Sequence, residues 1–275
     1  MLSKPIVIIS GINTAQSDPG PFLPAVAQTA SYSRSVSQAV AAARLGASVS
    51  AVGRVTDDDL GHRVVAELKT EGVDCTWLRI CAAGEPQLQT VDVELAEDAF
   101  SRVAVCVLNN ELPGEILEHT IGLCRRHGVE TLLNIGSLAE GEMPASAFQV
   151  DAVCCGEHEA AQLTGLSVVK NIRVAAACLA KRGCRSVVLR LGQHGSYVLA
   201  PEGESAVPGF AVPILDTTAA AAAFTAALAV ARCWDWKLGE AIRLANAAGA
   251  LAGSRMDAPD SMPTLAEVEA LLASS

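Results

Sequence analysis

The sequence predicts an α/β fold built on a doubly wound, mostly parallel sheet. Two observations carry this prediction. Strand-like and helix-like segments alternate along the chain, and residues 103–108 form a continuous apolar run, as expected for a strand that is buried on both faces. The Ala-rich segment 37–45 is typical of a helix, and Gly46 follows it as a C-cap. Repeated β–α units close into a parallel sheet, and its ligands bind beyond the carboxyl ends of the strands.

The elements follow from the same patterns in chain order. We predict strands at 6–9, 49–52, 76–80, 103–108, 131–134, 150–155 and 186–190, with a hairpin-like piece at 196–200. Residues 88–95 alternate in polarity and are therefore predicted as an edge strand. We predict helices at 37–45, 60–71, 114–127, 157–163, 172–182, 217–233, 238–252 and 265–273. The sequence shows neither an internal repeat nor a linker, which predicts a single domain over residues 1–275.

Composition and charge exclude several classes of protein. The 275 residues are 51% hydrophobic and 18% charged, which is typical of an ordered globular protein. The net charge of −10 and the scattered basic residues argue against a nucleic-acid partner. No window reaches the ~18 uncharged apolar residues that span a bilayer, and the apolar run at 6–9 is too short for a signal peptide. We therefore expect no membrane association and a cytoplasmic location.

The nine cysteines are interpreted as buried thiols of a reducing compartment. Their number is odd, and no pair has the CxxC spacing of a zinc site. Most of them lie in apolar runs such as Val105-Cys106-Val107. Disulfides and structural metals are therefore not expected.

Several segments together resemble the ribokinase family, the PfkB-type carbohydrate kinases. The segments are SQAVAAARLGASVSAVGRVTDDDLGHRVVAELKTEGVD, NELPGEIL, LLNIGS, CGEHEAAQLTG, VVLRLGQHGSYVL, LDTTAAAAAFTAALA and ANAAGALAGSRMDAPDSMPTLAEVEALL. They occur in the order of that family and cover essentially the whole chain. The resemblance implies a ribokinase-like three-layer α/β/α fold with a smaller β lid over the substrate.

The alanine run after Asp216 is where the chain departs most from the family. The family pattern is Asp-Thr-Thr-Gly-Ala-Gly-Asp-x-Phe, in which the glycines admit a phosphate to a helix N-terminus and the last Asp is the general base. Here Asp216, Thr217, Thr218 and Phe224 match, whereas Ala219 and Ala221 replace the glycines and Ala222 replaces the base. A methyl group accepts no proton, and loss of a general base typically costs about 10²–10⁴-fold in rate.

The resemblance also implies a nucleotide site. Its candidate residues are Thr217, Thr218, Ala219, Ala220, Ala221, Arg190, Gly192, Gly195 and Asn246. Arg190 stands where the family has Thr in Thr-Leu-Gly-x-x-Gly, and it could pair either with a phosphate or with an internal carboxylate. Asn246 matches a position that often borders the adenine, and His194 is interpreted as an exposed turn residue. Asp216 is the outside candidate for a replacement base, with Glu159 as the other carboxylate that could serve. The loop Arg255-Met256-Asp257-Ala258 replaces the family's cation-binding Arg-x-Gly-Ala.

The substrate and metal positions are changed as well. Asn13 remains near the first turn, but Ala15 stands in the position of the sugar-binding Asp. The substrate loop Gly-Gly-Lys-Gly-Ala-Asn-Gln-Ala aligns with YSRSVSQA, in which Arg34 keeps a positive charge and Gln38 matches. In the Pro-Asn-x-x-Glu metal motif only Glu159 is retained, and a Glu at such a position is by default a solvated residue. The two lid segments, about 12–36 and 84–102, are shorter than usual, so a reduced lid is expected and a homodimer is left open.

These losses favour a catalytically impaired pseudokinase that keeps a binding or regulatory role, with a small molecule or a protein as its partner. The alternative is an active, atypical ATP-dependent kinase that transfers phosphate to a hydroxymethyl group of a sugar or nucleoside. A third interpretation is a structural protein with an empty cleft. ATP or ADP with Mg²⁺ is the expected cofactor set if the cleft still binds, and none is expected otherwise.

Overall fold

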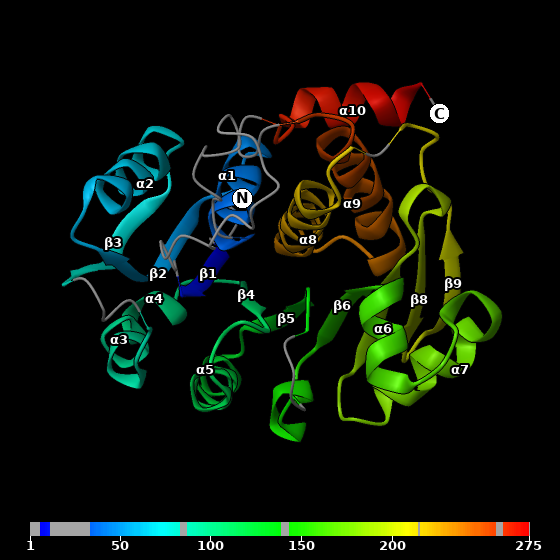
Figure 1. Ribbon diagram of the computed structural model, residues 1–275, viewed down its shortest axis with the longest axis horizontal. Helices are drawn as coiled ribbons and strands as arrows, with labels where there is room; N and C mark the ends of the chain where they lie inside the picture. Colours follow the sequence, from blue (N-terminus) through cyan, green and yellow to red (C-terminus); the bar gives the residue numbers. More distant parts are fainter. Residues whose placement is uncertain are drawn as a thin grey trace, which may run out of the picture.

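The computed structural model describes residues 6–11, 34–82, 87–138, 143–213, 215–256 and 261–274. They form three layers, with one sheet between two layers of helices (Figure 1). The predicted three-layer α/β/α fold is therefore confirmed. Asn13 and Ala15, and most of the first lid segment, lie outside the described residues.

The sheet has the strand order β3-β2-β1-β4-β5-β6-β7-β8-β9. Its strands are β1 (Ile6–Gly11), β2 (Val49–Thr56), β3 (Asp74–Cys81), β4 (Val105–Asn109), β5 (Glu130–Ile135), β6 (Ala152–Gly156), β7 (Ser186–Arg190), β8 (Ser196–Ala200) and β9 (Gly203–Val207). The strands from β3 to β7 pair in parallel, and β8 and β9 add an antiparallel edge. The strand order reverses between β1 and β4, which is where a doubly wound sheet opens a crevice at its carboxyl edge.

Helices cover both faces of the sheet (Figure 1). One layer holds α1 (Arg34–Arg44), α2 (Asp59–Thr70), α8 (Thr217–Cys233), α9 (Leu238–Gly253) and α10 (Leu265–Ala273). The other holds α3 (Thr90–Leu95), α4 (Glu97–Phe100), α5 (Gly114–His127), the 3₁₀ turn η2 (Ala145–Phe148), α6 (Glu157–Thr164) and α7 (Val168–Ala180). A further 3₁₀ turn, η3 (Gly192–His194), joins β7 to β8. Residues alternate along each strand, so that Val107 faces the first layer while Cys106 and Leu108 face the second.

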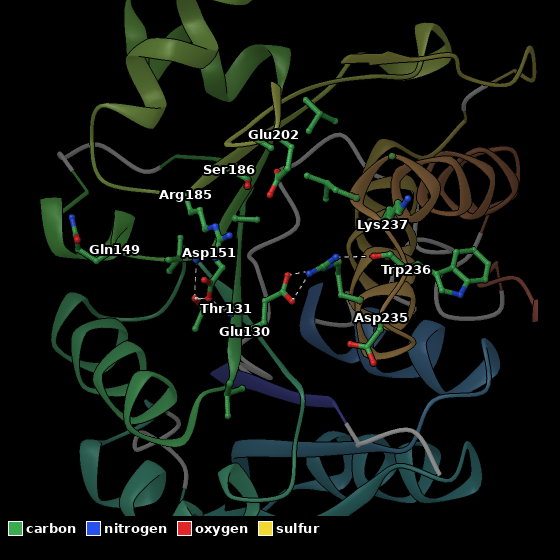
Figure 2. Close-up of a pocket in the computed structure, with 18 of the residues that line it drawn as sticks. Glu130, Thr131, Gln149, Asp151, Arg185, Ser186, Glu202, Asp235, Trp236 and Lys237 are labelled. Atoms are coloured by element: carbon green, nitrogen blue, oxygen red, sulfur yellow. Dashed lines mark hydrogen bonds and ion pairs between the residues drawn. The ribbon is translucent and has the colours of Figure 1, made fainter. Parts of the chain in front are cut away.

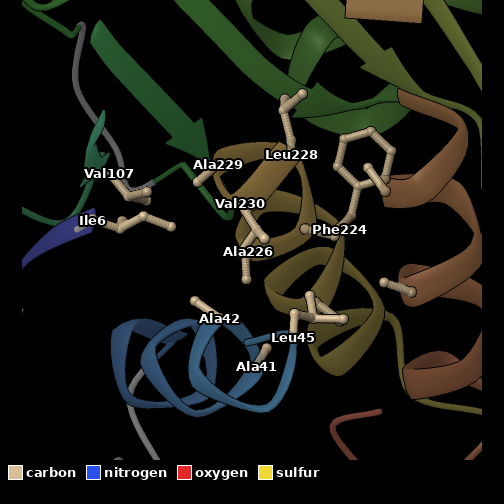
Figure 3. Close-up of a cluster of buried hydrophobic side chains, with 14 of the residues drawn as sticks. Ile6, Ala41, Ala42, Leu45, Val107, Phe224, Ala226, Leu228, Ala229 and Val230 are labelled. Atoms are coloured by element: carbon tan, nitrogen blue, oxygen red, sulfur yellow. The ribbon is translucent and has the colours of Figure 1, made fainter. Parts of the chain in front are cut away.

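Small side chains bring α8 close to α1 in the first layer. Figure 3 shows Ala41 and Ala42 of α1 facing Ala226 of α8, with Ile6 and Val107 of the sheet beside them. On the far side of α8, a Cβ built at Gly249 of α9 would lie 3.1 Å from the carbonyl oxygen of Ala220. The alanine-rich sequence thus makes α8 the central, closely packed helix of its layer.

Most predicted elements are confirmed, and five have the predicted bounds: α5, β7, β8, α8 and α10. The edge strand predicted at 88–95 is wrong, because the structure forms α3 there. The carboxylate of Asp92 accepts a 2.9 Å hydrogen bond from the backbone N–H of Gln89 and thereby caps the start of this helix. The same carboxylate pairs with Arg54 and Arg79 of the neighbouring strands, which fixes the helix against the sheet.

The cysteines and the apolar helices agree with the composition. All nine cysteines are free thiols, and six of them are buried. Burial raises the pKa values of Cys154 and Cys155 to about 12, so both thiols are protonated at neutral pH. Among the described residues, no single helix is long and apolar enough to cross a membrane. Only α6 and α7 taken together reach that length and hydropathy, across a bend of 63°.

Candidate functional site

A network of buried polar side chains lies at the carboxyl edge of the sheet, beside the point where the strand order reverses. Asn109 is the last residue of β4, and Asn134 is the penultimate residue of β5. Their side chains are 1% and 0% exposed. Buried polar groups are costly unless they are hydrogen-bonded, so their partners define the site.

The first half of the network joins α1 to β4. The amide groups of Gln38 and Asn109 exchange two hydrogen bonds, of 3.1 Å from Gln38 Nε2 and 2.9 Å from Asn109 Nδ2. Asn109 Nδ2 also donates to Ser35 Oγ at 3.0 Å. The predicted substrate residue Gln38 is thus 0% exposed, and its amide holds α1 against the sheet.

The second half leads across the sheet to Arg190 at the end of β7. Asn134 Nδ2 donates to Asn109 Oδ1 at 2.9 Å, and Arg190 Nη1 donates to Asn134 Oδ1 at 2.8 Å. Thr225 of α8 donates to the same Asn134 oxygen at 3.2 Å. Arg190 Nη2 donates to the carbonyl oxygen of Ile135 at 3.4 Å. The sequence left two kinds of partner open for Arg190, a phosphate or an internal carboxylate. Among the described residues, the hydrogen bonds of Arg190 go only to neutral oxygens, so no internal carboxylate pairs with it.

Arg34, the first residue of α1, lies over the same end of β5. A Cβ built at Gly136 would lie 2.2 Å from Arg34 Cζ, so the guanidinium rests directly on the glycine. The Arg34 side chain is 12% exposed, and its Nη1 lies 2.7 Å from Glu111 Oε1 as an ion pair. That nitrogen is nevertheless buried without a hydrogen-bond acceptor in the described part of the chain. Arg34 and Arg190 therefore converge on residues 134–136.

The N-terminus of α8 is capped by its own chain. Asp216 Oδ1 accepts hydrogen bonds from the backbone N–H groups of Thr218 (2.8 Å) and Ala219 (2.9 Å). These are N–H groups that the resemblance assigns to a phosphate, and Asp216 is the outside candidate for the base. Asp216 is therefore the N-cap of α8. Ala222, in the position of the family's base, is 0% exposed.

The remaining nucleotide candidates hold loops together. Asn246 of α9 accepts from Ser196 Oγ at 2.7 Å and donates to the carbonyl oxygens of Val207 (3.2 Å) and Pro208 (3.1 Å). Gly195 has φ +89°, and a Cβ there would lie 2.1 Å from Val207 O. Gly192 has φ +56° and begins η3, in which His194 is exposed as predicted.

The metal candidate Glu159 also has a structural partner. Its Oε2 accepts a 3.0 Å hydrogen bond from the N–H of Gly156 and caps α6. The described residues contain no cluster of three or more His, Cys, Asp or Glu that could hold a metal ion. In the C-terminal loop, Arg255 pairs with Glu267 Oε1 at 2.5 Å.

The sequence reasoning missed Asn109, Asn134 and Thr225, which connect the two arginines to the core. The two asparagines follow the apolar runs VCVL and TLL, at the ends of predicted parallel strands. An amide at that position is a usable signal, because the carboxyl ends of parallel strands meet at one edge. Thr225 gives no such signal in the sequence. A Thr within a helix can donate to the backbone of its own helix alone, and Thr225 does also donate to Ala221 O at 2.9 Å.

A separate cavity of about 1010 Å³ lies at the opposite, amino-terminal edge of the sheet (Figure 2). Its wall contains the bidentate pair between Glu130 of β5 and Arg232 of α8, at 2.8 and 3.0 Å. The hydrogen bonds that Arg232 donates to Glu130 raise the pKa of Arg232 above its ordinary value. Thr131 and Asp151, also labelled in Figure 2, bond to each other at 2.9 Å. Each charged group in these two pairs has a partner. The pair of Glu130 and Arg232 joins the sheet to α8, and the pair of Thr131 and Asp151 joins β5 to the start of β6.

Comparison with known proteins identifies the family. The pfkB family carbohydrate kinase model matches residues 36–94 and 82–265. The chain is 28% identical over 274 residues to the ribokinase of Bacillus subtilis, covering 89% of this chain and 88% of that protein. It is 28% identical over 275 residues to the aminoimidazole riboside kinase of Salmonella typhimurium, covering 86% of this chain and 85% of that protein.

Solved structures agree on the fold. The structure of Arabidopsis thaliana ribokinase complexed with ribose and ATP matches with a TM-score of 0.83 at 21% identity, covering 98% of this chain and 99% of that one. The ribokinase of Thermotoga maritima matches with a TM-score of 0.78 at 21% identity, covering 98% and 99%. The arrangement of strands and helices is thus that of these proteins. The family model, which matches most of the chain, shows that the chain belongs to the PfkB family of carbohydrate kinases.

Proposed function

We propose that this PfkB-family protein is a catalytically impaired kinase homologue that acts by binding a ligand. The observation that carries the proposal is Ala222, a buried methyl group in the position of the family's general base. Proton transfer to a positioned base contributes about 10²–10⁴-fold in such reactions, and no methyl group can supply it.

Two carboxylates that could have replaced the base support the proposal. Asp216 accepts two N–H groups of α8, and Glu159 accepts the N–H of Gly156. Using either one as a base would remove a helix cap. Asp216 is nevertheless the residue through which an active, atypical kinase would have to work, because it lies one and a half turns before Ala222.

The residues fit an ATP–Mg²⁺ complex poorly. Thr218 and Ala219 donate their N–H groups to Asp216, and the Asn246 amide bonds to its neighbouring loops. Mg²⁺ is usually held by one or two carboxylates together with phosphates, and Glu159 is engaged as a cap. We therefore propose no nucleotide or metal chemistry, and we place ligand binding at the carboxyl edge of the sheet, where the polar network ends in the partly exposed Arg190.

A phosphoryl-transfer assay tests the proposal. The protein is incubated with radiolabelled ATP and Mg²⁺ and with ribose, fructose or aminoimidazole riboside, in parallel with the Bacillus subtilis ribokinase. We expect no sugar phosphate above the enzyme-free rate. Turnover comparable with that of the ribokinase would overturn the proposal, and its loss in Asp216→Asn would then identify the base. Calorimetric titration with ATP and ADP, with and without Mg²⁺, measures nucleotide binding independently.

A further inference from the structure

The hydrogen-bond partners of Arg190 in the described part of the chain are all neutral, which favours the binding of an anion beside it. Arg190 is a permanent cation with five N–H donors. Its hydrogen bonds go to the side-chain oxygens of Asn134 and Thr225 and to the carbonyl of Ile135, and only the first, at 2.8 Å, is short. Its guanidinium also lies 5.9 Å from the centre of the Phe224 ring. A cation taken out of water needs a counter-charge, and the described residues place no carboxylate within ion-pair distance of it.

A second guanidinium stands beside it. Arg34 rests on Gly136, the residue that follows Ile135, whose carbonyl accepts from Arg190. Burial is the larger cause that lowers the pKa of Arg190, and the positive charge of Arg34 lowers it further. Arg34 does have a carboxylate partner, Glu111 at 2.7 Å, but Glu111 is 50% exposed and the contact lacks good hydrogen-bond geometry at the Nη1 of Arg34. The positively charged side chains of Arg34 and Arg190 therefore lie close to each other in a protein whose net charge is −10.

The polar network keeps this arrangement rigid. Asn134 accepts from Arg190, while Asn109 and Gln38 hold Asn134 from the other side. Every member of this relay is at most 1% exposed except Arg190, which is partly exposed. Fixed donors of this kind bind an anion without reorganising, which favours affinity.

The charge at this edge is opposite to what transfer to an alcohol requires. A general base is a carboxylate that meets a neutral hydroxyl, whereas here the base position is a methyl. Two guanidinium groups lie near it; the carboxylates beside them are Glu111, which pairs with Arg34, and Glu159, whose charge acts on Arg190. Guanidinium forks bind phosphate oxygens in pairs, and a phosphate monoester carries close to two negative charges at neutral pH. Two arginines suit such a dianion better than they suit a single carboxylate.

We propose that Arg34 and Arg190 together bind the phosphate group of a small phosphorylated molecule at the carboxyl end of β5. This inference rests on the proposed ligand-binding function and names the chemical class of its ligand. The phosphate could belong to a phosphorylated sugar or to a nucleotide, and the test separates these sources.

Thermal unfolding of the full chain tests the site. The probes are inorganic phosphate, ribose 5-phosphate and ADP without metal, compared with ribose and with KCl at the same ionic strength. We expect phosphate and ribose 5-phosphate to raise Tm in a concentration-dependent way, as a ligand of the native state does, and ribose and KCl to leave it unchanged. If phosphate acts no more strongly than KCl, the proposal is overturned. A shift with ADP that depends on Arg190 would support the site and identify a nucleotide as the source.

Matched variants assign the shift to these residues. Arg190→Gln should weaken phosphate binding at least tenfold, while Arg185→Gln, on an exposed residue just before the other end of β7, should bind phosphate as the wild type does. Asn134→Asp keeps Arg190 but gives it an internal carboxylate at the atom it already contacts, so it should also lose the phosphate response. This variant keeps the test decisive if Arg190→Gln fails to fold. A phosphate response in Arg190→Gln equal to that of the wild type contradicts the proposal.

The two proposals fail in different experiments. Phosphoryl transfer in the radiolabel assay would overturn the impaired-kinase function and leave the phosphate site standing. A wild-type protein that neither transfers phosphate nor responds to phosphate would overturn the site and leave the impaired-kinase function standing.

Discussion

Asp92 shows how one side chain can decide the fold of a segment. Its carboxylate is fully buried and accepts from Arg54 at 2.6 Å, from Arg79 at 3.0 Å and from the N–H of Gln89 at 2.9 Å. Such a buried charge is tolerated only because each of its oxygens has a donor. Asp92 is therefore the link between α3 and the strands β2 and β3.

Replacing Asp92 by Asn should destabilise the protein strongly. The change keeps the shape but removes the carboxylate charge that pairs with the buried Arg54, whose side chain is 6% exposed. Breaking a buried ion pair by removing one partner costs about 3–5 kcal/mol. Urea unfolding at neutral pH measures this loss. Asp98→Asn, on an exposed residue of α4 just six residues away, is the matched control and should change the free energy of unfolding by less than about 0.5 kcal/mol.

The same pair gives the prediction a pH dependence. Burial alone would raise the pKa of Asp92, but the hydrogen bonds from Arg54, Gln89 and Arg79 hold it below its ordinary value of 3.8. A carboxylate whose pKa is lower in the folded state contributes stability above the unfolded pKa, and loses it as the pH falls towards the folded value. The difference between wild type and Asp92→Asn should therefore be full at neutral pH and shrink below about pH 4. A difference that grows in acid would contradict this account.

At the scale of elements, α8 has alanines at two positions where the family pattern has glycines, and this composition favours helix. Its cap, Asp216, and its run of alanines both favour helix, and its predicted bounds are confirmed. Ala219 is buried against the core, so the added methyl group there also contributes packing.

Restoring glycine in α8 should therefore lower stability. Ala221→Gly should reduce the free energy of unfolding by about 1 kcal/mol, and Ala219→Gly should also lose the burial of its methyl group. Gly122→Ala in α5 is the mirror-image control, because a Cβ there meets no atom within 4 Å. That variant should gain up to about 1 kcal/mol. Chemical denaturation compares all three, and glycine variants as stable as the wild type would show that the run is not a stabilising feature.

The contrast between α8 and α3 shows what the sequence can predict. The signals that define α8 are local: a cap residue and alanines within one segment. The stabilising partners of α3, Arg54 and Arg79, are remote in the sequence. Within α3 itself, polar and apolar residues alternate as they do in a strand. The site divides in the same way. Gln38 and Arg190 were predicted from family motifs, but their connection through Asn134 arises only when β4, β5 and β7 lie side by side.

At the scale of the whole molecule, one sheet serves two cores. Leu45, directly after α1, belongs to the core on one face and Leu123 of α5 to the core on the other, and both are at most 1% exposed. The strands between them alternate their side chains into both cores, so neither core can be exposed without disturbing the other. We propose on this ground that the chain folds as a single cooperative domain.

Calorimetry of two matched variants tests this proposal. Leu45→Ala and Leu123→Ala remove the same side chain from opposite faces of the sheet, and each should cost about 2–5 kcal/mol. If the chain is one cooperative unit, the wild type unfolds in one transition whose calorimetric and van't Hoff enthalpies agree, and each variant moves that whole transition to lower temperature. Two independent units would behave differently, because each variant would lower one transition and leave a second at the wild-type temperature. A phosphate-induced shift of the whole transition would further show that a ligand at the carboxyl edge stabilises both faces together, since ligand binding adds to the stability of whatever unit unfolds with the site.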